Sequence, residues 1–143
     1  MISQTRSRVA IGTALLTATF FLLSVGSAPA QSSRAKATIP FAFYWGEGML
    51  PAGDYDVKSL GNGIAGLFNR NTHTSAAFMT VGVSSPTGEP VNGKLIFHRY
   101  GEDYFLSEMW WEGQSVGSRL LPSKAERELA RGVGPARIAV AVR

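Results

Sequence analysis

The stretch KLIFHRYGEDYFLSEMWW, residues 94–111, decides the fold expected of this chain. Two runs rich in apolar and aromatic residues, 94–100 and 104–111, flank Gly101-Glu102-Asp103, an arrangement typical of a β-hairpin. Other alternating segments, separated by short turn signals, occupy 38–45, 54–59, 64–68 and 75–83, and 138–142 could add a last strand. This spacing predicts an antiparallel sandwich or a small barrel of about six to seven strands, not βαβ units.

Local signals sharpen the expected connections. Asn62-Gly63 accepts the positive φ angles that a tight hairpin requires. Pro40 lacks an N–H, which predicts either that its strand lies at a sheet edge or that the proline lies near the start of the strand. Ser123 and Glu126 fit the capping box, in which each side chain bonds the other's backbone N–H, and this predicts a short helix over 123–131. The expected class is therefore all-β with one short C-terminal helix.

The first thirty residues have the pattern of a secretory signal peptide. Arg6 and Arg8 precede an uncharged apolar run, 9–25, and Ala28-Pro29-Ala30 matches a small-x-small cleavage site. A retained anchor helix is the alternative, but the run is short for about 30 Å of hydrocarbon. We therefore expect cleavage after residue 30 and an exported protein, periplasmic or extracellular, with no transmembrane segment after cleavage.

The remaining sequence, 31–143, has the length of a single β-rich domain, with 31–35 as a disordered polar leader. The chain contains no cysteine, so its stability depends on packing, or on packing and self-association, without disulfides. After residue 30 the chain has 12 Lys and Arg against 10 Asp and Glu. A net charge this small is not that of a nucleic-acid-binding surface, so no nucleic-acid partner is expected.

Four motifs in order carry a resemblance to a known group of proteins. They are Ile39-Pro40-Phe41-Ala42-Phe43, Leu50-Pro51-Ala52-Gly53-Asp54-Tyr55, the run from Gly93 to Gly101, and Ala125-Glu126-Arg127-Glu128-Leu129. In these motifs the chain resembles a family of uncharacterised small exported proteins of acidobacteria-like soil bacteria. The resemblance implies an exported, β-rich, single-domain protein, and it assigns no catalytic or binding residue.

No pattern in the chain predicts catalysis, a metal site or a cofactor. Gly113-Gln114-Ser115-Val116-Gly117 matches the G-x-S-x-G nucleophile motif, but both histidines, His73 and His98, lie upstream of it. The chain order of a serine-hydrolase triad is therefore not met. Two histidines without cysteine are too few strong ligands for a typical zinc site. A hydrolase using Ser115 or a carboxylate pair is the least favoured interpretation.

The aromatic residues of the hairpin are the candidate binding residues. Trp110 and Trp111 are adjacent in a strand, so they must point to opposite faces. If Tyr100 pairs with Tyr104, one face carries His98, Tyr100, Tyr104 and Trp110, and His98 could face Glu108 across the hairpin as an ordinary cross-strand polar pair. Either the helix and the last strand cover that face, or it is an open platform of the kind that suits sugar rings and apolar ligands.

Two functional interpretations follow from these features. The first is a non-enzymatic, exported β-domain of the cell envelope that binds a saccharide or a small apolar ligand through its aromatic face. The alternative is a structural or protein-interaction domain, which pairs with an envelope protein or with itself through the edge strand containing Pro40.

Overall fold

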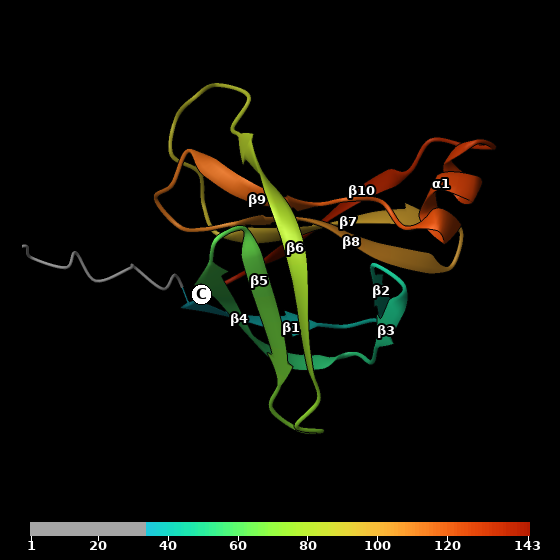
Figure 1. Ribbon diagram of the computed structural model, residues 1–143, viewed down its shortest axis with the longest axis horizontal. Coiled ribbons are helices and arrows are strands. Elements are labelled where there is room, and N and C mark those ends of the chain that lie inside the picture. Colours follow the sequence, from blue (N-terminus) through green and yellow to red (C-terminus); the bar gives the residue numbers. More distant parts are fainter. Residues whose placement is uncertain (1–33) are drawn as a thin grey trace, which may run out of the picture.

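The computed structural model describes residues 34–143, in which ten strands and one helix form (Figure 1). The elements in chain order are β1 (Arg34–Ile39), β2 (Phe43–Trp45), β3 (Gly48–Leu50), β4 (Gly53–Gly61), β5 (Ile64–Asn69), β6 (Ser75–Ser84), β7 (Lys94–Tyr100), β8 (Asp103–Trp110), β9 (Val116–Leu120), α1 (Lys124–Ala130) and β10 (Ala136–Ala141). The prediction of an all-β fold with one short helix is confirmed. The predicted signal peptide lies outside the described residues.

The predicted number of strands, six to seven, is too low for three local reasons. Residues 38–45 form two strands, because Pro40 has no N–H to continue the ladder. β3 and β9 are short and contain glycine, so their sequences resemble turns. β1 also begins at Arg34, so the last two residues of the expected leader belong to the strand that pairs with β4.

The strands form a mixed sheet in the order β1-β4-β5-β6-β9-β8-β2-β3, with β7 paired to β8 and β10 paired to β7. The expectation of purely antiparallel pairing is wrong at one place, where β2 runs parallel to β8. β6 is long enough to pair with two strands: its first half pairs with β5 and its second half with β9. This long strand crosses the whole molecule in Figure 1.

The first and last described strands meet at one point. The backbone N–H of Lys36 donates to the carbonyl oxygen of Arg143 at 2.8 Å, and the N–H of Arg143 donates to the carbonyl oxygen of Lys36 at 3.0 Å. Within residues 34–143 no further ladder pairing joins β1 to β10. β1 is therefore only partly an edge strand.

Aromatic rings dominate the core. Phe97 is 0% exposed, and its ring meets those of Phe41 and Phe43 edge-to-face, with centroids 5.0 and 5.3 Å apart. Around these rings pack buried aliphatic side chains from most strands, among them Ile39, Val57, Leu67, Leu95, Leu106 and Met109. The core thus joins the hairpin β7–β8 to β1, β4 and β5.

Two of the predicted local signals are confirmed. Asn62 and Gly63 have φ angles of 51° and 71° in the turn between β4 and β5. Ser123 is the N-cap of α1, and its hydroxyl accepts a hydrogen bond from the N–H of Glu126 at 3.1 Å. The reciprocal half of the capping box is absent, because the Glu126 carboxylate turns to His98 instead.

Candidate functional site

The hairpin β7–β8 turns over two residues, and this fixes which side chains share a face. Tyr100 lies opposite Asp103, and His98 lies opposite Phe105. The predicted pairing of Tyr100 with Tyr104 is therefore wrong by one residue. Gly101 adopts a φ of 62°, which allows the shorter turn. A shift of one residue moves a side chain to the other face of the sheet.

The five predicted site residues are consequently divided between two faces. Tyr104 turns toward the core, where its ring stacks on Phe41 with centroids 3.8 Å apart. Trp111 also belongs to the core. His98, Tyr100 and Trp110 remain on the opposite face. The two tryptophans do point to opposite sides, as predicted, but they are only 5% and 6% exposed, so neither forms an open aromatic platform.

Trp110 is held in place by a close approach to β9. A Cβ atom on Gly117 would lie 2.7 Å from Cδ2 of Trp110 and 2.8 Å from the carbonyl oxygen of Met109. The indole therefore packs directly on the glycine backbone. The last glycine of the G-x-S-x-G motif is thus explained by packing.

Substituting Gly117 with alanine should lower the free energy of unfolding by about 1–3 kcal/mol, because the added methyl group forces Trp110 to move. Urea denaturation checks this value. Gly82→Ala is the matched control, because its Cβ would meet only Val116 at an ordinary 3.8 Å. An equal loss of stability in both variants would contradict the tight packing of Trp110.

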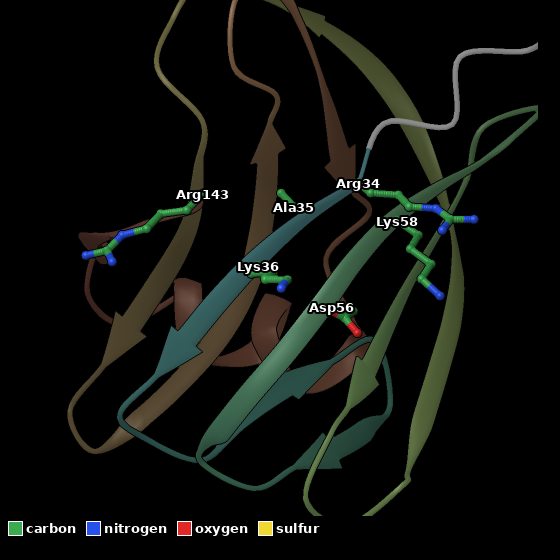
Figure 2. Close-up of a pocket in the computed structure, with 6 residues that line it drawn as sticks. All are labelled: Arg34, Ala35, Lys36, Asp56, Lys58 and Arg143. Atoms are coloured by element: carbon green, nitrogen blue, oxygen red, sulfur yellow. The ribbon is translucent and has the colours of Figure 1, made fainter.

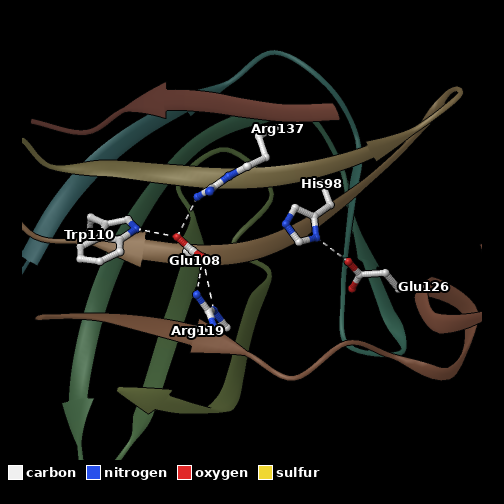
Figure 3. Close-up of polar contacts among 6 residues, drawn as sticks. All are labelled: His98, Glu108, Trp110, Arg119, Glu126 and Arg137. Carbon is white, nitrogen blue, oxygen red and sulfur yellow. Dashed lines mark hydrogen bonds and ion pairs between the residues drawn. The ribbon is translucent and has the colours of Figure 1, made fainter. Parts of the chain in front are cut away.

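A buried carboxylate organises the face around Trp110 (Figure 3). Oε2 of Glu108 accepts from Nε1 of Trp110 at 2.9 Å and from Nη2 of Arg137 at 3.1 Å. Oε1 accepts from Nε and Nη2 of Arg119 at 3.3 and 3.0 Å. Arg119 lies opposite Glu108 on β9, and Arg137 reaches it from β10, across β7. One carboxylate on β8 therefore fixes two guanidinium groups from opposite sides.

The environment of Glu108 keeps it ionised at neutral pH. Burial by itself would raise the pKa of the carboxyl group. Hydrogen bonds from Trp110 and Arg119 and the charges of Arg137 and Arg119 outweigh the burial, so the pKa of Glu108 lies below its ordinary value of 4.5. The carboxylate is thus a permanent anchor for the two arginines.

Above this anchor lies a surface groove of about 340 Å³, which we call the Glu108 groove. Its lining includes Lys94, Ile96, Glu108, Trp110, Arg119 and Arg137. Three cationic side chains thus face one carboxylate. The side chains of Arg119 and Arg137 are 48% and 61% exposed, so their unbonded N–H groups are accessible to a ligand. The arrangement is suited to binding an anion.

His98 takes part in a separate contact. Its Nδ1 lies 2.9 Å from Oε1 of the buried Glu126, which connects β7 to α1 (Figure 3). The sequence suggested Glu108 as a partner for His98, and that suggestion is wrong. Tyr100 lies close by, and its pKa is raised, first by partial burial and then by the charge of Glu126. These contacts attach the helix to the sheet.

Arg119 and Arg137 were not predicted as site residues, and Glu108 was expected only as a cross-strand partner of His98. One signal was available: Glu108 is a charged residue between Ser107 and Met109 in a strand that is otherwise mostly apolar. A buried charge in such a strand requires partners. The sequence does not identify those partners, because they come from β9 and β10.

Comparison with known proteins finds no matching family model, no similar curated protein and no similar solved structure. Among the described residues, no three or more histidine, aspartate or glutamate side chains gather as a metal-binding group would require. No helix between residues 34 and 143 is long and apolar enough to cross a membrane.

Proposed function

We propose that this protein is an exported, non-enzymatic domain of the cell envelope that binds a small anionic ligand in the Glu108 groove. The observation that carries the proposal is the arginine pair held by Glu108. A planar guanidinium group binds a carboxylate through two parallel hydrogen bonds. Because Glu108 already fixes Arg119 and Arg137, these two side chains would lose less conformational entropy when a ligand binds.

An acidic saccharide is the ligand class that fits the groove best. Its carboxylate would meet Arg119, Arg137 and Lys94, and the apolar face of a sugar ring would lie against the more exposed apolar part of the lining, Val83, Pro86 and Val91. The volume of about 340 Å³ is at the small end for ligand pockets, which favours a short ligand. A saccharide thus remains the proposed ligand, but it would contact the cationic side chains of the Glu108 groove instead of an open aromatic face.

Export is supported by the residues at the start of the chain. The charged residues before the apolar run and Ala28-Pro29-Ala30 after it form the signal-peptide pattern. The resemblance to small exported proteins of soil bacteria agrees with this pattern. An acidic envelope polysaccharide would be available to a domain in that location.

The fold that carries the groove is, in this proposal, a small barrel. The path of paired strands leads from β1 through β4, β5, β6, β9, β8 and β7 to β10. The two hydrogen bonds between Lys36 and Arg143 join the two ends of this path. A barrel turns the Glu108 groove outward, because the interior is occupied by the aromatic core.

Digalacturonate and its neutral counterpart, galactobiose, test the proposal. The indole N–H resonance of Trp110, which donates to Glu108, serves as the probe in an NMR titration. We expect a saturable shift with digalacturonate and none with galactobiose. Arg137→Ala should weaken binding about tenfold, a change of about 1.4 kcal/mol.

Arg131→Ala is the matched control, because it removes an exposed arginine of the helix region that pairs only with Glu128. It should leave the affinity unchanged. Equal responses to the acidic and the neutral sugar, or an unchanged affinity in Arg137→Ala, would reject the groove as an anion site. The other interpretation of the sequence, an interaction domain with an exposed strand edge, involves a different surface.

A further inference from the structure

The main-chain groups of β1 and β10 face each other without pairing beyond a single point. In antiparallel strands, alternate residues direct their N–H and C=O groups to the same neighbour. Lys36 and Arg143 bond each other, so Thr38 on β1 and Ala141 on β10 direct their groups into the space between the strands. In residues 34–143 no ladder pairing of these strands fills that space.

The space is a groove of about 490 Å³, which we call the β1–β10 gap. Thr38, Ala141 and the inward-facing Ala37 and Val140 line it, together with the charged residues Lys36, Asp54, Arg70 and Arg143. A side chain that packs on the core can also line a surface groove only at a place where two neighbouring strands have separated. The gap therefore runs along two strand edges, above the buried Ala37 and the half-buried Val140.

β10 has little protection against an added strand. Val142 donates to Gly93 beside β7, so the alternate residues Ala139 and Ala141 direct their N–H groups into the gap. Both are exposed and small. Proteins normally protect a free edge with lysine, proline or a bulge. The one charged residue of β10, Arg137, is held by Glu108.

The surroundings of the gap are basic. Figure 2 shows the adjoining pocket, which is lined by Arg34, Lys36, Lys58 and Arg143 around one carboxylate, Asp56. That carboxylate is already paired with Arg70, at 2.6 Å. No described carboxylate side chain forms an ion pair with Lys36 or Arg143, which line both the pocket and the gap. The gap itself is lined by three cationic side chains, Lys36, Arg70 and Arg143, and one carboxylate, Asp54, and this excess of positive charge favours an acidic occupant.

We propose that the β1–β10 gap binds an extended, acidic segment of another protein, which adds a strand to β10. Main-chain hydrogen bonds to Ala139, away from the end that Lys36 and Arg143 close, supply affinity that depends little on the side chains of the segment. Lys36 and Arg143 select segments with acidic side chains. This binding surface is separate from the Glu108 groove and independent of its ligand.

The test uses three fluorescently labelled peptides and the protein from residue 31 onward, with binding followed by fluorescence anisotropy. The first is acetyl-Glu-Val-Glu-Val-Glu-Val-amide; the second has lysine in place of glutamate; the third is the first peptide with N-methylated valines. We expect the acidic peptide to bind at least ten times more tightly than either of the others. Equal affinity of the N-methylated peptide would overturn strand addition and indicate attraction by charge alone.

Two variants and a control complete the test. Ala139→Pro removes an N–H that faces the gap but leaves the β7 ladder intact, so it should weaken binding of the acidic peptide at least tenfold. Lys36→Glu should weaken it similarly, and Lys124→Glu, an exposed charge reversal on α1, should not. Self-association that Lys36→Glu abolishes, without binding of the acidic peptide, would identify a second copy as the occupant and refute the proposal.

Discussion

Replacing Phe97 with alanine should lower the free energy of unfolding by about 3–5 kcal/mol, the loss expected when a fully buried aromatic side chain is removed. The side chain is fully buried, and its ring contacts Phe41 and Phe43 at once. Its removal leaves a cavity between β7 and the N-terminal strands, which the surrounding rings cannot fill because each is held by other contacts. Urea denaturation followed by tryptophan fluorescence measures the loss.

Leu121→Ala is the control for Phe97→Ala. Leu121 is exposed, so its truncation should change the free energy of unfolding by less than about 0.5 kcal/mol. Phe97 also follows the register shift between Ile96 and Phe97 in β7. A loss below about 1 kcal/mol in Phe97→Ala would mean that the side chain faces away from the core, and the register of the hairpin would then be wrong.

Replacing Glu108 with alanine should lower the free energy of unfolding by about 2–4 kcal/mol. The variant leaves the buried indole N–H of Trp110 without its acceptor and removes the common partner of Arg119 and Arg137. The expected loss is below that of a fully buried ion pair, because both arginines are about half exposed and can turn to water. Chemical denaturation at pH 7 measures this loss.

The pH dependence of stability gives an independent check on Glu108. Its pKa in the folded protein is below the ordinary value of 4.5, so its contribution to stability is complete above that value. The contribution is lost as the pH falls below 4.5 through the lower pKa of the folded state. Between about pH 5 and pH 3, where the Glu108 carboxylate becomes protonated, the free energy of unfolding of Glu108→Gln should therefore decline less steeply than that of the unchanged protein.

The control for the pH experiment is Glu128→Gln, which changes an exposed carboxylate paired with Arg131. Its stability should decline with acid as steeply as that of the unchanged protein, since exposed pairs contribute little. If Glu108→Gln and the unchanged protein declined in parallel, Glu108 would not be the ionised anchor of the cluster.

The features that were predictable from the sequence are those that depend only on neighbouring residues. Asn62-Gly63 forms its turn and Ser123 caps its helix, because each requires only a few adjacent backbone groups. The strand register of the β7–β8 hairpin was not predictable, because a difference of one residue in the turn changes it. The turn at Gly101-Glu102 is one residue shorter than assumed, and Tyr104 consequently points into the core.

The candidate site was only partly predictable for a different reason. Trp110 was predicted because it is adjacent to Trp111 in a strand, so the two side chains must point to opposite faces. The arginines that surround it, Arg119 and Arg137, lie 9 and 27 positions further along the chain. They reach Glu108 because β9 and β10 approach β8 from opposite sides, an order of strands that the spacing of segments does not encode.

The long strand β6 has a consequence for the way the molecule unfolds. Since its first half belongs to the ladder with β5 and its second half to the ladder with β9, neither part of the sheet is complete without it. The two parts should therefore lose their structure in one cooperative step, with similar protection of their central amides in hydrogen exchange. The β4–β5 hairpin forms from neighbouring residues, but pairing β6 with β9 closes a loop of more than thirty residues, so assembly around β6 should limit the rate of folding.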